Sequence, residues 1–291
     1  MDPVLVHTIR KKSTKKNTWF GTTEEDNDIC GLAILDKELF VIVENSSEIE
    51  VYDSVKFNIC RQWNLKELIN PKDIASCRTN QCLYILDYKT TDQSSEILRV
   101  ATNGKLLTKW STGVGASNGL SVTSEANIIL TAYLEHTLNE YFPDGQLIRE
   151  IYLSSDVHVH VRNPIPHYAV KLANGNFLIC GANFCDYQHT VCTVDADGKL
   201  EKSFGGKCGS TNAQVSFPVY LSVDGNGFVM VADPANCRVL LLDSDLQFKR
   251  EILSRGGHGL GLQYPNRILL DESTGRLFVA DKRSILIFEF K

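Results

Sequence analysis

The sequence contains no hydrophobic run long enough to cross a membrane. A membrane-spanning helix needs about 20 consecutive apolar residues, and no apolar stretch of this 291-residue chain approaches that length. Residues 1–10 also lack the basic and long apolar segments of a secretory signal. We therefore predict a cytoplasmic protein with no membrane contact, in which the sequon Asn45-Ser46-Ser47 stays unglycosylated.

Several enzyme motifs are missing as well. There is no G-x-S-x-G sequence of the kind that carries a hydrolase nucleophile. The glycine clusters at 113–115 and 256–261 lack the Lys-Ser/Thr that follows a phosphate-binding loop. Only two methionines occur, which argues against an all-helical fold, and the 43% hydrophobic and 22% charged residues exclude generic disorder and coiled coil.

The nine cysteines do not follow a metal-binding pattern. Neither Cys77 and Cys82 nor Cys180 and Cys185 have the C-x2-C spacing of a zinc knuckle. We expect reduced thiols that are mostly buried as small hydrophobic side chains, with zinc or disulfides as the alternative.

The net charge of −5 is unevenly distributed along the chain. Residues 1–16 carry +4, because Arg10–Lys16 holds five basic residues, so the remainder carries −9. A domain that acidic is not organised around phosphate neutralisation. We interpret the basic run as a solvated loop, with a nuclear-localisation signal or an anionic-partner patch as the alternative.

A repeat organises the chain. Its two clearest copies, at 217–243 and 264–288, share a Val-Ala-Asp sequence that ends at Asp233 and at Asp281. Weaker copies place the repeat starts near residues 29, 71, 117, 166, 218 and 265. Short runs of Val, Ile, Leu, Phe and Tyr between turn residues are typical of strands. A period of roughly 40–50 residues then fits a four-stranded propeller blade, whereas HEAT repeats of similar length need helical periodicity.

Two unpaired segments predict how the ring closes. The last copy stops after its third strand, and Val4–Ile9 predicts a strand without a blade of its own. We therefore predict a single all-β domain over residues 1–291, a six-bladed β-propeller of four-stranded blades. Its N-terminal strand pairs with Ile285–Phe288 of the last blade and closes the ring. We expect residues 11–28 to be a basic and polar loop before the first blade.

The glycine-rich segments before the last two copies resemble a known family. Phe204-Gly205-Gly206 leading to Phe217-Pro218 is similar to the linker of NHL repeats, and so is the segment from Gly256 to Pro265. The chain thus resembles the six-bladed NHL propeller at the carboxy terminus of tripartite-motif proteins, through motif in the last two copies and through pattern in the first four. The resemblance implies a propeller that binds protein partners or, in some members, RNA. It also implies substrate recognition in a ubiquitin-ligase context.

Two sets of polar residues have structural explanations. Asp233 and Asp281 end strands where the chain turns, so we expect their carboxylates to accept backbone N–H bonds in the following loop. His158, His160 and His167 could hold zinc, but an exposed linker strand between blades is the preferred interpretation because no fourth ligand stands at a suitable spacing.

Some six-bladed propellers are metal-dependent lactonases or lyases with ligands around the central channel. The corresponding positions here read Lys72-Asp73, Asn118-Gly119, His167-Tyr168, Val219-Tyr220 and Asn266-Arg267. Lys72 and Arg267 would oppose a hard cation, which needs several converging oxygens. We expect no catalysis, no metal and no other cofactor, with a metal-dependent hydrolase as the lesser alternative.

We predict that one loop face binds a partner. The loops between blades, and those between second and third strands, should lie at one end of the propeller. That geometry places on one face Lys72, Tyr168, Tyr220, Arg238, Arg267 and Arg283. Tyr and Arg are enriched in interface hot spots, so a protein or peptide partner is expected. RNA stacked on Tyr168 and Tyr220 is the alternative, and the isolated domain is expected to be monomeric.

Overall fold

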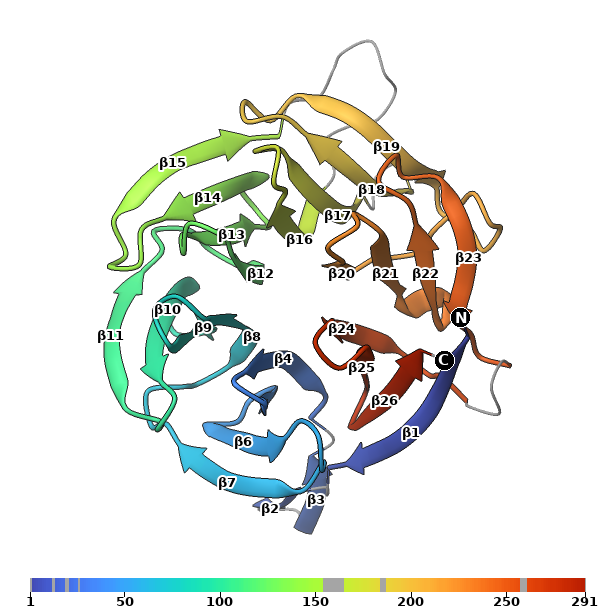
Figure 1. Cartoon of the computed structure of the whole chain (residues 1–291). Helices are drawn as coiled ribbons and strands as arrows, with labels where there is room; N and C mark the ends of the chain where they lie inside the picture. Colours follow the sequence, from blue (N-terminus) through green and yellow to red (C-terminus); the bar gives the residue numbers. More distant parts are fainter. Residues whose placement is uncertain are drawn as a thin grey trace.

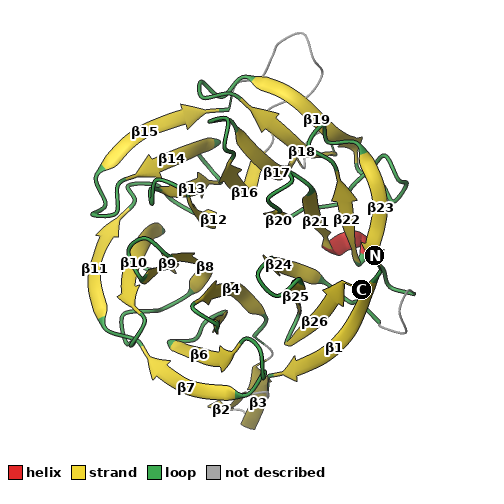
Figure 2. Cartoon of the chain, in the orientation of Figure 1, coloured by secondary structure: helices red, strands yellow, loops and turns green. Residues whose placement is uncertain are grey.

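The computed structural model describes residues 2–11, 14–18, 21–25, 27–153, 165–183, 187–256 and 261–290. Apart from one 3-10 turn, η1 (Pro234–Asn236), the regular elements within these ranges are strands (Figure 2). They form six four-stranded antiparallel sheets that are arranged as blades in a ring (Figure 1). The prediction of a six-bladed β-propeller is confirmed. No helix in the described part of the chain is long and apolar enough to cross a membrane.

Each blade runs from an inner strand at the centre of the ring to an outer strand at its rim (Figure 1). Blade 1 contains β4 (Ile29–Leu35), β5 (Glu38–Val43), β6 (Glu48–Asp53) and β7 (Ile59–Asn64). Blade 2 contains β8 (Pro71–Cys77), β9 (Cys82–Lys89), β10 (Ser94–Ala101) and β11 (Leu106–Ser111). Blade 3 contains β12 (Ser117–Val122), β13 (Ile128–Ala132), β14 (Thr137–Tyr141) and β15 (Leu147–Tyr152).

The second half of the ring repeats this order. Blade 4 contains β16 (Ile165–Lys171), β17 (Phe177–Asn183), β18 (Gln188–Val194) and β19 (Leu200–Lys207). Blade 5 contains β20 (Tyr220–Val223), β21 (Val229–Asp233), β22 (Arg238–Leu242) and β23 (Phe248–Leu253). Blade 6 contains β24 (Pro265–Asp271), β25 (Arg276–Asp281), β26 (Ser284–Phe290) and, as its outer strand, β1 (Pro3–Arg10).

Pairing of β1 with β26 closes the ring as predicted. The two strands are antiparallel, with Leu5 opposite Phe288 and Ile9 opposite Ile285. The two ends of the chain therefore belong to the same blade, where they lie side by side (Figure 1).

The segment between the closing strand and blade 1 needs a correction. Within the predicted loop, β2 (Thr14–Thr18) and β3 (Gly21–Glu25) form a two-stranded antiparallel hairpin that is separate from the blades. The polar composition that suggested a loop does not distinguish a loop from a short hairpin of polar residues. The threonines of both segments, whose β-branched side chains favour extended backbone, are the signal that was missed.

Buried aspartates at the ends of second strands hold the loops that enter the blades. Asp233 accepts a hydrogen bond of 2.8 Å from the backbone N–H of Ser216, and Asp281 accepts one of 3.0 Å from that of Gln263. Asp87 does the same for Asn70 at 2.7 Å. The predicted acceptance of backbone N–H bonds is confirmed, but the loop involved precedes the inner strand of the same blade instead of following the aspartate.

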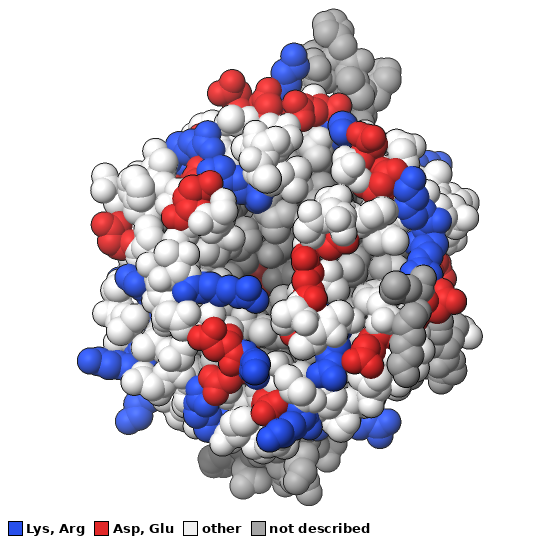
Figure 3. Space-filling view, viewed as in Figure 1, with Lys and Arg blue, Asp and Glu red and all other residues white. Residues whose placement is uncertain are grey.

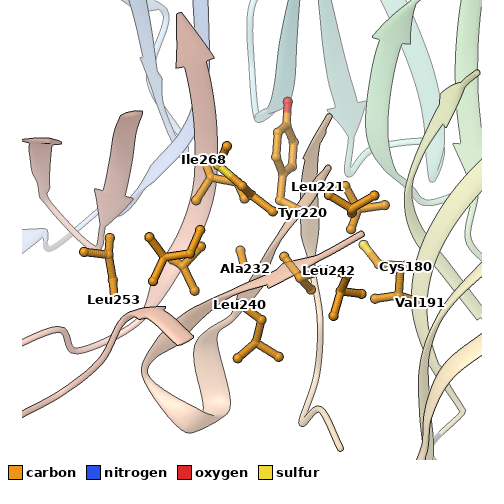
Figure 4. Close-up of a cluster of buried hydrophobic side chains, with 14 of the residues drawn as sticks. Cys180, Val191, Tyr220, Leu221, Ala232, Leu240, Leu242, Leu253 and Ile268 are labelled. Atoms are coloured by element: carbon orange, nitrogen blue, oxygen red, sulfur yellow. The ribbon is translucent and has the colours of Figure 1, made fainter. Parts of the chain in front are cut away.

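Hydrophobic layers between neighbouring blades make up the core. In one of them, Cys180 and Val191 of blade 4 face Leu221 and Leu242 of blade 5, with Ile268 of blade 6 on the far side (Figure 4). Burial of apolar surface contributes about 25 cal/mol per Å². These layers fix each inner strand against the next, so the ends of the inner strands keep a defined arrangement.

Candidate functional site

The inner strands β4, β8, β12, β16, β20 and β24 all begin at the same end of the propeller. First and third strands of an antiparallel blade run in the same direction. Arg238, at the start of β22, and Arg283, just before β26, therefore lie at this end too. We call this end the mouth face. It contains all six residues that the sequence predicted for the partner-binding face, although their side chains differ greatly in accessibility.

Five of the six inner strands carry a β-bulge at the mouth face. The pairing register with the second strand shifts at one residue of each, namely Cys30, Lys72, Asn118, His167 and Asn266. A bulge leaves one residue outside the ladder and re-aims its side chain, and bulges are common next to functional sites. The bulges therefore present one side chain per blade at equivalent positions around the ring.

Three of these bulge residues connect their blade to the next one. Asn266 Nδ2 donates to the carbonyl oxygen of Ile29 at 2.8 Å, and Cys30 Sγ donates to that of Pro71 at 3.1 Å. His167 Nδ1 lies 2.9 Å from the carbonyl oxygen of Pro218. These bonds join blade 6 to blade 1, blade 1 to blade 2 and blade 4 to blade 5, so the three side chains have a structural role.

The other two bulge residues make no such bond. The Lys72 ammonium and the Asn118 amide are half-buried and have no hydrogen-bond or ion-pair partner among the described residues. The buried Ser117 hydroxyl, next to Asn118, also lacks a partner within the described ranges, as does Nε2 of His167. Two half-buried side chains without partners thus lie in neighbouring blades at the mouth, Lys72 in blade 2 and Asn118 in blade 3, and Oδ1 of Asn266 in blade 6 also lacks a partner among the described residues.

Beneath the bulges, a layer of buried side chains spans the channel. The rings of Tyr168 and Tyr220 stack with centroids 3.8 Å apart, and the Arg267 guanidinium carbon lies 5.0 Å from the Tyr220 centroid. Such stacked and cation–π contacts add to the stability of buried aromatic rings. Tyr168 and Tyr220 are only 7% and 6% exposed, so neither ring is available to stack on a nucleobase.

Arg267 and Asp73 form an ion pair inside this layer, with Nε and Oδ1 3.5 Å apart. Asp73 is fully buried and accepts hydrogen bonds of 2.9 Å from the backbone N–H groups of Ile74 and Leu120. Burial raises the pKa of Asp73 to about 6, although Arg267 and the backbone donors act in the opposite direction. Removing one partner of a buried pair costs about 3–5 kcal/mol, because a charge is left uncompensated.

His167 is enclosed between two aromatic rings. Its ring centroid lies 6.1 Å from that of Tyr133 and 4.7 Å from that of Phe217. Burial lowers the pKa of His167 to about 4, so the imidazole is neutral at neutral pH. The Pro218 carbonyl can only accept, so Nδ1 carries the proton and Nε2 is an acceptor.

Phe217, which contacts His167, has an unusual backbone conformation. Its φ of 62° is rare for a bulky residue. Its backbone N–H donates to Nδ1 of His189 at 2.7 Å, which holds the segment in place. Backbone strain of this kind tends to occur at functional sites.

The Arg238 side chain is buried, whereas the sequence predicted that it would be displayed on the mouth face. It is only 4% exposed. Its guanidinium pairs with Asp233 at 2.8 Å and donates to the carbonyl oxygens of Ser210 and Gln214 at 3.0 and 2.8 Å. Arg238 therefore anchors the loop between blades 4 and 5, a use that the sequence pattern alone does not distinguish from display on a surface.

Arg283 lies apart from the channel, at the junction of blades 6 and 1. It lines a groove of about 700 Å³ together with Arg10, Lys11, Glu48, Glu50 and Tyr52. Lys11 and Glu50 form an ion pair of 2.9 Å across this groove. The six predicted residues thus divide into one at the channel mouth, three in the buried layer, one loop anchor and one groove residue.

The structure extends the sequence interpretation at two points. The aligned dipeptides had placed Lys72, Asn118, His167 and Asn266 at equivalent positions, but only the register reveals the bulges. Ser117 carried no sequence signal of its own. No group of three or more His, Cys, Asp or Glu side chains that could hold a metal occurs among the described residues, and His158 and His160 lie outside them.

No protein-family model matches this sequence, and no curated protein matches it either. Solved structures do share the fold. A Bacteroides thetaiotaomicron protein of unknown function has a TM-score of 0.66 at 12% identity, covering 96% of this chain and 73% of its own. Virginiamycin B lyase from Staphylococcus aureus has a TM-score of 0.63 at 11% identity, with 96% and 99% covered.

A third similar structure is an auxiliary nutrient binding protein from Bacteroides thetaiotaomicron. Its TM-score is 0.64 at 12% identity, with 90% of this chain and 69% of that chain covered. At such identities the similarity shows the β-propeller fold alone, because one fold carries many functions. Membership of the NHL family stays a prediction.

Proposed function

We propose that this propeller is a non-catalytic binding module whose mouth face takes a protein or peptide partner. The observation that supports this most is the pair of half-buried bulge side chains Lys72 and Asn118, which have no hydrogen-bond or ion-pair partner among the described residues, at positions whose counterparts in other blades make structural bonds. A ligand that bonds to both side chains makes hydrogen bonds that the described part of the protein does not itself make.

Two observations favour a protein or peptide over RNA. The tyrosines that could have stacked on bases are buried against each other. Outside residues 1–16 the chain carries a net charge of −9, and the end of the propeller shown in Figure 3 has Lys and Arg interspersed with Asp and Glu. An RNA-binding surface instead gathers basic side chains along the path of the phosphates.

The cellular setting follows from the chemistry of the chain and from its resemblance to NHL propellers. Eight cysteines are free thiols among the described residues, and most of them are buried. This favours a reducing compartment such as the cytoplasm. The resemblance adds the proposal that the partner is a ubiquitin-ligase substrate. Co-expression with candidate ligases, followed by measurement of partner ubiquitination, tests that part.

The binding role is tested by blocking each end of the propeller in turn. Peptides selected from a random display library by the unmodified protein are measured against two variants. Asn118→Trp places a bulky ring at the channel mouth, and Asn226→Trp places one in an exposed turn at the opposite end. We expect binding to be lost only in Asn118→Trp. Loss only in Asn226→Trp would place the site at the other end, and failure to select any peptide would contradict the binding role.

A further inference from the structure

The outer strand of each blade has one edge that pairs with no other strand among the described residues. The strands β7, β11, β15, β19, β23 and β1 each end their sheet, so these free edges lie at the rim of the ring (Figure 1). An unpaired edge is a template on which another extended chain can add a strand. Proteins commonly prevent this by placing charged side chains, lysine above all, on the edge strand.

Five of the six outer strands carry charged residues within their length. Examples are Arg61 in β7, Lys109 in β11, Arg149 in β15, Lys202 in β19 and Lys249 in β23. The strand β1 differs, because Val4–Ile9 contains no Asp, Glu, Lys or Arg. Val4 and Val6 are also 44% and 39% exposed. Among the six described blades, β1 is therefore the outer strand with an uncharged and partly apolar edge.

The backbone of β1 is free to pair on this edge. Within the described ranges, Pro3–Arg10 makes no backbone hydrogen bond except with β26. The register between β1 and β26 shifts at Val6. Such a bulge can turn an edge away from a partner, but the other five outer strands carry a shift as well, so the bulge does not distinguish β1 from them.

The charged residues that flank this stretch are self-complementary. Asp2 precedes β1, Arg10 ends it, and Val6 lies midway between them. If two copies of β1 pair antiparallel about Val6, Asp2 of each copy lies opposite Arg10 of the other, and Val4 lies opposite Thr8. Pairs of opposite charge and pairs of β-branched residues both stabilise antiparallel strands.

Both charged side chains are available for this pairing. Arg10 is exposed and has no partner among the described residues. Asp2 pairs with Arg250 at 2.6 Å, but the Asp2 side chain is 83% exposed. An exposed ion pair of this kind contributes at most about 1 kcal/mol, so Asp2 can exchange Arg250 for another cation at little cost.

We propose that the free edge of β1 pairs antiparallel with β1 of a second copy of this chain, centred on Val6. The four-stranded sheets of the two copies of blade 6 then join into one continuous sheet through an isologous interface. Since this interface lies at the rim, it leaves the mouth face open and does not depend on the proposed peptide binding.

The dimer should be weak. One short strand pair buries less surface than the roughly 1,200–2,000 Å² of stable interfaces. We expect a Kd on the order of 0.1 mM. The domain, which was expected to be monomeric, would then dimerise only at high protein concentration.

Analytical ultracentrifugation over a concentration series up to about 1 mM tests the proposal. Val6→Lys sets two like charges opposite each other at the centre of the strand pair and should raise the Kd about tenfold or more. Leu107→Lys is the matched control and should leave the Kd unchanged. Leu107 is an apolar residue, 46% exposed, on an outer strand that already contains Lys109. The melting temperatures of both variants check that they are folded.

A charge exchange tests the register. Asp2→Arg alone sets two arginines opposite each other and should weaken the dimer, whereas Asp2→Arg combined with Arg10→Asp should restore it. A protein that stays monomeric over the whole concentration series would overturn the inference, and so would a dimer that Val6→Lys leaves intact, since its interface would lie elsewhere. Loss of the dimer in Val6→Lys without recovery in the charge exchange would overturn the pairing centred on Val6.

Discussion

Arg267 of blade 6 donates a hydrogen bond of 2.8 Å to the carbonyl oxygen of Lys72 in blade 2, although 195 residues separate them. The same guanidinium pairs with Asp73, the next residue of β8. One side chain thus connects two blades that are not neighbours in the ring. It forms a second closure at the channel, independent of the β1–β26 pairing at the rim.

Loss of this second closure should be strongly destabilising. Arg267→Met keeps an unbranched side chain of similar reach but leaves Asp73 buried without its counter-charge. We expect a loss of about 3–5 kcal/mol in the free energy of unfolding, measured by urea denaturation. Arg255→Met, at an exposed arginine, is the control and should change stability by less than about 0.5 kcal/mol. If Arg267→Met is as stable as Arg255→Met, the contacts of Arg267 with Lys72 and Asp73 do not stabilise the ring.

The pH dependence of stability should reveal the buried imidazole. His167 has a pKa of about 4 in the folded protein, against an ordinary value of 6.5. As pH falls below 6.5, the unfolded chain takes up this proton while the folded protein does not, so stability is lost down to pH 4. The loss amounts to about 3 kcal/mol, since one pKa unit corresponds to about 1.4 kcal/mol. In the His167→Asn variant, this loss of stability between pH 6.5 and 4 should be absent.

Asparagine is the matched replacement at this position. Asn266, the equivalent bulge residue of blade 6, already makes the corresponding bond to the next blade through Nδ2. Asp73 titrates in the opposite sense, because its raised pKa favours the folded state as pH falls from about 6 to 3.8. The contribution of Asp73 is the same in the unmodified protein and in His167→Asn, so it cancels when their free energies of unfolding are subtracted. A difference in unfolding free energy that stays constant between pH 7 and 4 would contradict the assignment.

The sequence predicted the architecture because the information for it is local and repeated. Turn residues and short apolar strands recur in each blade, and the unpaired strand Val4–Ile9 required a partner. The site was harder to predict. A bulge depends on register, and the burial of Tyr168 depends on Tyr220, 52 residues later in a different blade. The burial of Arg238 could not be predicted for the same reason, because the carbonyl oxygens that it binds are brought together only when the loop between blades 4 and 5 folds.

Gly119 should be intolerant of substitution because blade 4 approaches it closely. A Cβ at this position would lie 2.6 Å from the His167 carbonyl oxygen and 2.9 Å from Tyr168 Cδ2. Gly119→Ala must therefore push β16 away from β12, with an expected cost of about 1–3 kcal/mol and weaker peptide binding at the mouth. Gly256→Ala has open space around its Cβ and is the control. Thermal unfolding and affinity for a selected peptide are measured, and unchanged values for Gly119→Ala would exclude close packing here.

The closing strand should be required for a stable ring. Deleting residues 2–10 removes the outer strand of blade 6 and leaves the edge of β26 unpaired. It also removes the buried Ile9 and the partly buried Leu5, which packs against the core. Burial of each such side chain contributes about 1.5–3 kcal/mol, and a domain of this size loses roughly 2–4 °C per kcal/mol. We expect aggregation, or a melting temperature lower by about 6 °C or more.

Replacing residues 14–25 by a short Gly-Ser linker is the control, because that hairpin pairs with no blade strand. If the truncated protein stays monomeric with an unchanged melting temperature, the ring does not depend on β1, and the mouth must be held by the interblade bonds and Arg267 alone.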